Sequence, residues 1–176
     1  MLKEVIEQEY RVHWILDNLP VGIRSVDDMG GLVHRGFPVG MLRQISAKTK
    51  EHYMYNHVRI IVRYSEKPEE HDGIRIVGFE VVPFSIKHTY EGSYEQDKTT
   101  LSTCNPLTQI RHNPNNLQPI GKSGSEVIYT YETKWEKSDL SWTNRWDVYI
   151  RGVADDDIHY FSIVNSLCCF CPGCWR

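Results

Sequence analysis

The densest group of reactive side chains lies in residues 168–176, which read CCFCPGCWR. Cys171 and Cys174 form a C-x-x-C pair, the spacing used by zinc sites and thiol redox centres. A structural zinc site usually takes two ligand pairs separated by a turn or loop, and the adjacent Cys168 and Cys169 are poorly placed for this. A redox C-x-x-C lies at a helix N-terminus within a βαβ unit. We therefore interpret this segment as an atypical Cys-rich tail without metal or redox function.

Other groups that could do chemistry are scattered along the chain. The sequence has no H-E-x-x-H, no G-x-S-x-G, no phosphate-binding glycine loop and no recognisable Cys–His signature. We therefore predict that the chain is not an enzyme, and we assign no catalytic, cofactor-binding or metal-binding residue, no cofactor and no small-molecule substrate. The dispersed histidines are His13, His34, His52, His57, His71, His88, His112 and His159.

Aromatic side chains are concentrated near the end of the chain and could form a platform for a ligand. Such residues more often fill a core or line a junction between a sheet and a membrane, so we expect packing rather than binding. Lys137, Ser138, Asp139 and Arg145 interrupt the group and are expected to form an exposed turn. The group comprises Trp135, Trp142, Trp146, Tyr149 and Tyr160.

Composition narrows the class of protein. A chain of 176 residues is long enough for one core. Acidic and basic residues are interspersed and the formal net charge is −3, so no clustered basic patch indicates nucleic acid as a partner. The many tyrosines, tryptophans and β-branched residues favour strands over helices.

The elements that must position these residues are mostly strands. Helical spacing of apolar residues predicts a short helix over residues 2–9, and the remaining segments alternate with a period of two. We predict a mostly β fold, an antiparallel β-sandwich with a short N-terminal helix. The expected strands are Tyr10–Leu16, Val58–Tyr64, Ile74–Pro83, Val127–Trp135, Trp146–Ile150 and Ile158–Val164, with turn or bulge glycines at Gly36 and Gly40.

A long polar loop is expected at residues 91–125, which contain three prolines, four asparagines and little apolar periodicity. Structureless connections of this length are uncommon in compact domains. We interpret it as a surface loop, with a role in binding a partner as the alternative.

Several segments resemble the nonaspanins, the transmembrane nine superfamily or Emp70 family. They are YRVHWILDNLPVG (10–22), GFPVG (36–40), YNHVRIIVRY (55–64), RIVGFEVVPFSIKH (75–88), YTYETKWEKSDLSWTNRWDVYI (129–150) and IHYFSIVNSL (158–167). They occur in the order found in that family, and the combination SDLSWTNRWDVY to FSIVNSL is long and uncommon.

The resemblance implies a lumenal β-rich domain at residues 1–157, followed by the start of the first membrane helix at residues 158–167. It implies an endosomal or Golgi membrane protein that sorts or localises other membrane proteins. The expected partners are therefore membrane proteins as cargo and the lipid bilayer, which the membrane helices would enter.

Two features of the sequence depart from that family. The N-terminus lacks the apolar core of a signal peptide, and after Leu167 the expected apolar helix is replaced by CCFCPGCWR. The mostly apolar run 158–170 is therefore too short for a bilayer span of about 20 apolar residues. We therefore expect the chain to be a portion of a longer protein, truncated at the first membrane helix. The alternative is a free-standing soluble β-sandwich that binds partners and carries a genuine, metal-binding Cys-rich tail.

The implied compartment leads to two further hypotheses, and the expected truncation leads to a third. An oxidising lumen would favour a disulfide on Cys104, with its partner outside this chain. Protonation of all eight histidines would add eight positive charges to the net charge of −3 near endosomal pH, so conformation or docking could depend on pH. If strands outside this chain belong to the same sheet, an edge near Tyr10–Leu16 or Tyr129–Trp135 is unpaired.

Overall fold

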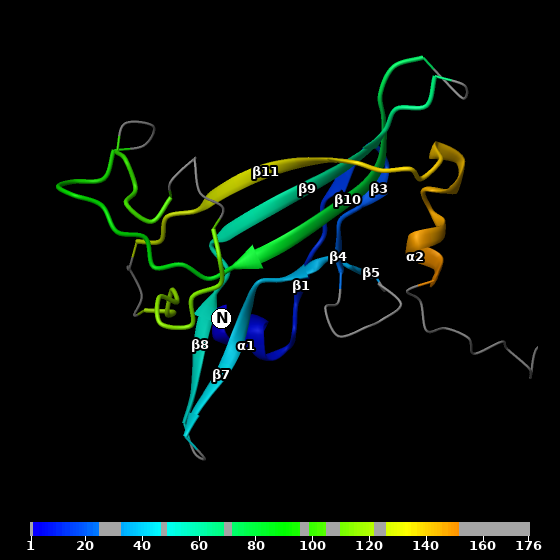
Figure 1. Ribbon diagram of the computed structural model, residues 1–176. Coiled ribbons are helices and arrows are strands. Elements are labelled where there is room, and N and C mark those ends of the chain that lie inside the picture. Colours follow the sequence, from blue (N-terminus) through cyan, green and yellow to red (C-terminus); the bar gives the residue numbers. More distant parts are fainter. Residues whose placement is uncertain are drawn as a thin grey trace, which may run out of the picture.

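A computed structural model describes residues 2–24, 33–46, 49–68, 72–95, 99–104, 110–121 and 126–151 (Figure 1). One short helix, eleven strands, a 3₁₀ turn and a second short helix follow one another in these ranges. Their bounds are α1 Leu2–Glu7, β1 Arg11–Val12, β2 Ile15–Leu16, β3 Leu19–Pro20, β4 Gly22–Arg24, β5 Val33–Arg35, β6 Phe37–Pro38, β7 Gly40–Ser46, β8 Thr49–Met54, β9 His57–Ser65, β10 Arg75–Phe84, β11 Thr130–Lys137, η1 Trp142–Asn144 and α2 Asp147–Arg151.

A five-stranded sheet forms the centre of the molecule, with the strand order β11-β9-β10-β4-β5. The pairs β9–β10 and β4–β5 are antiparallel, as expected for strands joined by short connections. The pairs β11–β9 and β10–β4 are parallel. The mostly β class with a short N-terminal helix is confirmed, and the central sheet is mixed because β11 returns from the long loop in the direction of β9.

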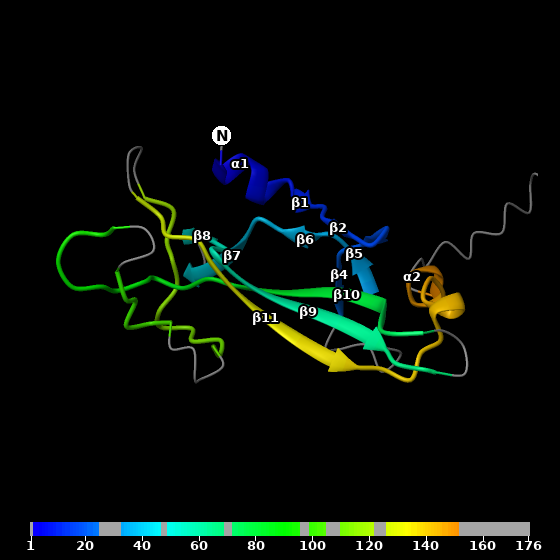
Figure 2. The same ribbon diagram turned by 90° about the horizontal axis from the view of Figure 1, so that it is seen from above.

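Three two-stranded ribbons accompany this sheet, namely β1–β6, β2–β3 and β7–β8. Figure 2 shows α1, β1, β2 and β6 as a layer beside one face of the sheet, and Figure 1 shows the β7–β8 hairpin projecting away from it. The hairpin was not expected, because its strands are mostly exposed and lack a clear apolar alternation.

Alternating side chains give the central sheet two different faces. In the β9–β10 ladder, Val62 lies opposite Phe79 and Ile60 lies opposite Val81, which makes one face apolar. Phe79 and Val81 are buried in the core cluster, whose members are Leu19, Val21, Val33, Phe37, Phe79, Val81 and Tyr149. We call this side the apolar face. The opposite side carries Arg59, Arg63, Glu80, Glu132 and Glu136, and we call it the charged face.

Several expected elements are found where the sequence placed them, and one is not. The strands expected at Val58–Tyr64 and Ile74–Pro83 are β9 and β10, and the expected N-terminal helix is α1. The strand expected at Trp146–Ile150 is wrong, because residues 147–151 form α2. There Tyr149 enters the core and its hydroxyl donates to the carbonyl of Phe79.

The segment expected as one strand over Tyr10–Leu16 is divided into β1 and β2. Gly36 adopts φ 72°, which only glycine occupies easily, and a Cβ there would lie 2.8 Å from the His13 ring. This supports the expected turn. Gly40 lies at the start of β7, where a Cβ would meet the carbonyl oxygen of Tyr53 at 2.3 Å, so its role is close backbone approach.

Candidate functional site

The apolar face of the sheet is only partly covered, and it carries an open groove of about 440 Å³. One wall comes from β1, β6 and the residues next to them, the floor from β9, and the other wall from β11 and its approach. We call this the aromatic groove. Its lining residues are Val12, Trp14, Phe37, Val39, Tyr55, Asn56, Val58, Ile60, Tyr129, Thr130 and Tyr131.

The first wall is held by a short ladder and an aromatic contact. Val12 of β1 pairs with Phe37 of β6, which fixes these two side chains beside each other. The ring of Trp14 meets the ring of Phe37 edge-on, with centroids 4.9 Å apart and planes at 75°. Edge-to-face contacts of this kind are favourable beyond the area they bury. This wall is therefore preformed.

The second wall is formed by tyrosines that the strand register directs outward. Tyr131 pairs with Val58 across the β11–β9 ladder, so both point to the apolar face. Tyr131 is 74% exposed and Tyr129 is 66% exposed. The Tyr129 hydroxyl donates to the sulfur of Met54 at 2.9 Å. Large aromatic side chains that are exposed on a rigid sheet are suited to binding another polypeptide rather than to catalysing a reaction.

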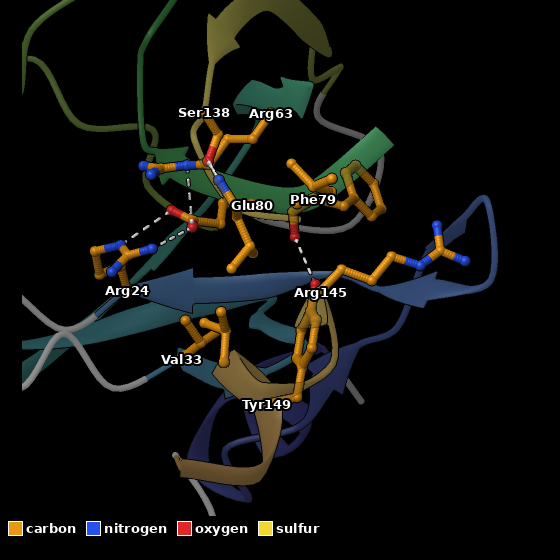
Figure 3. Close-up of a pocket in the computed structure, with 12 residues that line it drawn as sticks. Arg24, Val33, Arg63, Phe79, Glu80, Ser138, Arg145 and Tyr149 are labelled. Atoms are coloured by element: carbon orange, nitrogen blue, oxygen red, sulfur yellow. Dashed lines mark hydrogen bonds and ion pairs between the residues drawn. The ribbon is translucent and has the colours of Figure 1, made fainter. Parts of the chain in front are cut away.

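Charged-face residues of β4, β9 and β10, together with residues of α2, line a smaller cavity of about 200 Å³ (Figure 3). Glu80, with a side chain only 9% exposed, lies between two guanidinium groups: Nη2 of Arg24 is 2.6 Å from Oε1, and Nε of Arg63 is 3.4 Å away. Glu136 approaches Arg63 at 3.3 Å. The hydrogen bond to Glu80 raises the pKa of Arg24.

These neighbouring charges neutralise one another, so the cavity does not offer an anion a surplus of positive charge. The hydrogen bond from Lys134 lowers the pKa of Glu136, which keeps that carboxylate ionised beside Arg63. Ion pairs between arginine and a carboxylate suit such partly buried sites because the guanidinium group is planar and always charged. We interpret this cluster as a structural connection between β4, β9, β10 and β11.

A chain of polar side chains crosses the end of the same face. Nδ1 of His57 lies 2.7 Å from Oγ1 of Thr130, which lies 2.9 Å from Nε2 of His88, and Nδ1 of His88 lies 2.8 Å from Oγ1 of Thr103. Burial, together with His57, lowers the pKa of His88 to about 4. Burial also lowers the pKa of His57. The nearby Glu132 carboxylate acts in the opposite direction, but its effect is smaller than that of burial. Both imidazoles are therefore neutral at neutral pH.

Cys104 lies beside this chain and is half-buried. Burial raises the pKa of its thiol, and the hydrogen bond with Thr130 opposes this only in part. A thiol needs a lowered pKa to act as a nucleophile at neutral pH. The proximity of a cysteine and histidines therefore does not make a reactive pair here. Within the part of the chain that the structure describes, no three His, Cys, Asp or Glu side chains are placed to hold a metal ion.

The aromatic group predicted from the sequence is divided by the structure. Tyr149 is buried, as expected of a core residue, whereas Trp135, Trp142 and Trp146 are 61%, 39% and 41% exposed and are not core residues. The alternative expectation for these three, packing at a junction with a membrane, stays a prediction. Tyr160 lies outside the described residues. The sequence missed the aromatic groove, although the alternation Tyr129, Tyr131, Thr133 and Trp135 placed two tyrosines on one face of a strand.

Arg145 also differs from its expected place in an exposed turn, because it is 5% exposed. Its guanidinium donates to Asp17 at 2.6 Å and to the carbonyl of Ile76 at 3.1 Å, and it lies over the ring of Trp142. A helical spacing was the available signal, since Arg145 and Tyr149 are four residues apart.

The remaining predicted features lie outside the described residues: the cysteines of the tail, His71, His159 and the expected membrane segment 158–167. In the described ranges, neither α1 nor α2 is long and apolar enough to pass through a bilayer.

Comparison with known proteins shows which family has a sequence similar to that of this chain. The Endomembrane protein 70 family matches residues 1–172. The chain belongs to the Endomembrane protein 70 family. Its resemblance to the transmembrane nine superfamily is thereby confirmed, and the described fold is a β-rich unit of a family of membrane proteins.

Relatives of this Endomembrane protein 70 chain occur in distant eukaryotes. Transmembrane 9 superfamily member 10 of Arabidopsis thaliana is 43% identical over 169 residues, which cover 94% of this chain and 26% of the relative. Putative phagocytic receptor 1a of Dictyostelium discoideum is 33% identical, with 95% and 25% covered. Transmembrane 9 superfamily member 4 of Homo sapiens is 32% identical, with 95% and 26% covered. The chain thus spans about a quarter of their length, and no solved structure matches it.

Proposed function

We propose that this chain is a lumenal portion of an endosomal or Golgi membrane protein and that it helps to sort other membrane proteins or to place them at the surface. The observation that carries this proposal is the family match over residues 1–172. One relative is named a putative phagocytic receptor, a name consistent with work at membrane surfaces.

The described residues support a binding role. The aromatic groove is open and apolar, and its walls are fixed by the β1–β6 and β11–β9 ladders. The histidines and the cysteine that come together at Thr130 are not activated, because burial keeps the imidazoles neutral and the thiol protonated. Contact between this chain and cargo is therefore non-covalent in the proposal, and the aromatic groove is the surface that makes it.

Surface abundance of membrane proteins in cells tests the sorting role. The gene that encodes this chain is disrupted, and the membrane proteins on the cell surface are quantified with and without the intact gene restored. We expect a defined set of multi-pass proteins to leave the surface and to return on rescue. An unchanged surface population would refute the sorting role.

A pair of matched variants then tests the aromatic groove. Tyr131→Lys places a charge in the groove, whereas Ile45→Lys places the same charge on β7, where the side chain is already 55% exposed. We expect Tyr131→Lys to fail in rescue and Ile45→Lys to rescue fully, at equal protein levels. Full rescue by both variants would remove the groove from the proposal.

The lumenal location is tested separately, by protease protection in sealed membrane vesicles. An epitope inserted after Tyr94, in the exposed loop, reports which side of the membrane the chain occupies. We expect protection in intact vesicles and cleavage once detergent is added. Cleavage in intact vesicles would place the chain on the cytosolic side.

A further inference from the structure

The two edges of the central sheet differ in length and in cover. At one edge, β5 has three residues and contacts α2. At the other, β11 has eight residues, and among the strands that the structure describes only β9 neighbours it (Figures 1 and 2). A long strand with one neighbour presents a row of unpaired N–H and C=O groups that can pair with another chain.

The pairing with β9 determines which backbone groups of β11 point outward. The N–H of Thr130 donates to the carbonyl of Asn56 at 3.0 Å, and the N–H of Ser138 donates to the carbonyl of Tyr64 at 2.8 Å. Even-numbered residues therefore direct their backbone groups to β9. Because these groups alternate along a strand, Tyr131, Thr133 and Trp135 direct theirs to the open edge.

Two of the features that usually prevent edge pairing, a bulge and a proline, are absent from β11. Its register with β9 is continuous from Thr130 to Lys137, with no bulge, and the strand contains no proline. The side chains of Tyr131 and Trp135 are 74% and 61% exposed, so no described segment packs over them. The charged side chains of the strand have both signs, so a strand that pairs with β11 must carry charges complementary to them.

We infer that a second copy of this chain pairs antiparallel with β11, about a two-fold axis at Thr133. Symmetric dimers use the same patch on both subunits, so this edge must be complementary to itself. The inference concerns self-association and does not rest on the proposed sorting function.

Self-complementarity appears when the strand is placed against its own copy. With Thr133 opposite Thr133 of the second copy, Tyr131 faces Trp135 and Glu132 faces Lys134. The outward residues Tyr131, Thr133 and Trp135 then occupy hydrogen-bonded pairs, as their backbone direction requires. Opposite charges and aromatic pairs directly across an antiparallel ladder are both favourable.

Neighbouring registers are worse for the same reasons. An axis at Glu132 sets two glutamates against each other, and an axis at Lys134 sets two lysines against each other and Glu132 against Glu136. An axis at Trp135 pairs opposite charges, but it sets residues 130–132 opposite residues 138–140, which lie beyond the end of β11. The Thr133 axis is the one that pairs most of the strand without opposing like charges.

The same axis extends both faces of the sheet across the contact. Lys134, which already approaches Glu136 of its own chain at 2.8 Å, gains Glu132 of the second copy. On the apolar face, Tyr131 and Trp135 of the two copies form one band that joins the two aromatic grooves. The dimer therefore has one continuous sheet, in which the charged faces of the two copies adjoin each other and the apolar faces do the same.

A proline substitution tests the edge without touching the β9 ladder. Thr133→Pro removes an outward N–H, a position where proline is compatible with an edge strand. By light scattering after gel filtration, we expect the full chain to show twice its 20.6 kDa mass as concentration rises, and Thr133→Pro to stay monomeric with unchanged circular dichroism. Thr133→Val, which keeps the N–H, is the control and is expected to dimerise. A parent chain that is monomeric throughout, or a dimeric Thr133→Pro, overturns the inference.

Cysteine cross-linking tests the register and does not depend on whether the proline variant folds. Under mild oxidation, Thr133→Cys is expected to form a disulfide between the two copies, which peptide mass spectrometry identifies against the native cysteines. Trp135→Cys alone is expected to form none at position 135, whereas a mixture of Tyr131→Cys and Trp135→Cys chains links 131 to 135. A 135–135 disulfide, or no link at 133, overturns the Thr133 axis.

Charge reversal measures the contribution of the ion pairs. Lys134→Glu sets like charges against each other at two symmetric places, so we expect a roughly tenfold weaker dimer. Lys50→Glu makes the same change on the exposed strand β8 and is expected to leave the dimer unchanged. Equal effects of the two variants would show that net charge, rather than the β11 contact, controls association.

Discussion

The two faces of the central sheet are stabilised in different ways. The charged face neutralises itself, with Glu80 held by Arg24 and Arg63. The apolar face is packed around Phe79 and Val81 but remains open along β11, where Tyr131 and Trp135 are exposed. Half of the apolar face therefore holds the fold together, and the other half is available for contacts with other chains.

The largest expected effect comes from the packed half of the apolar face. Phe79 is 5% exposed, and Phe79→Ala removes a buried ring and leaves a cavity, which costs about 3–5 kcal/mol. Urea unfolding followed by circular dichroism measures this loss. Val82→Ala, on the same strand but on the other face and 37% exposed, is the control. Equal losses from the two variants would mean that the faces do not differ in packing.

On the charged face, the buried carboxylate is expected to matter more than an exposed one. Glu80→Gln keeps the size of the side chain but removes the buried negative charge that Arg24 and Arg63 share, which costs about 1–3 kcal/mol. The matched control is Glu66→Gln, whose partner Lys137 lies on the surface, and its unfolding midpoint is expected to stay unchanged. Indistinguishable midpoints for Glu80→Gln and the parent would show that this cluster does not stabilise the fold.

Acid is expected to weaken the end of the charged face where His57 and His88 meet Thr130. The pKa of His88 is lowered from 6.5 to about 4, so the unfolded chain binds protons more readily than the folded one. The stabilising effect of the neutral imidazole is therefore complete above pH 6.5 and is lost as the pH falls from 6.5 through 4. The low pKa of His57 acts in the same direction.

The unfolding midpoint, measured across that pH range, checks this prediction. His88→Gln should flatten the pH dependence, whereas His34→Gln, at an exposed position on β5, should leave it as in the parent chain. A parent chain that is equally stable at both ends of the range would contradict it.

The smallest effect on stability is expected in the open half of the apolar face. Tyr131→Ser should change the free energy of unfolding by less than about 0.5 kcal/mol, because this side chain is 74% exposed. The same change at buried Tyr149, which is 3% exposed, should be far more costly. Both are measured at low protein concentration, where association does not contribute. A large loss from Tyr131→Ser would mean that the aromatic groove belongs to the core.

Sequence reasoning succeeded where one local pattern decides one element. The alternation in Val58–Tyr64 and Ile74–Pro83 predicted β9 and β10, which form an antiparallel pair around the polar connection 65–73. It failed at Trp146–Ile150, where the alternation is overruled by a helical turn that buries Tyr149 and Arg145. Short segments rich in aromatic residues fit either structure, so the contacts made after folding decide between them.

The candidate site was predictable only in part. Alternation along residues 129–135 indicated that the tyrosines share one face of a strand, and an unpaired edge near them was among the expectations. The opposite wall of the aromatic groove was not predictable, because Trp14 and Phe37 are brought to β11 by the β1–β6 ladder. The pairing of β11 with β9 joins segments more than 70 residues apart, and no local pattern specifies such a partner.

The sequence by itself determined the family, the mostly β class and which side chains of each strand share a face, because these depend on residue type and a period of two. Tertiary structure alone decided that Glu80 meets two arginines, that His88 is buried beside His57, and that β11 lies at the edge with its tyrosines open. Those outcomes depend on which strands become neighbours. That choice is made by the packing of the whole sheet, whose energy is shared among residues far apart along the chain.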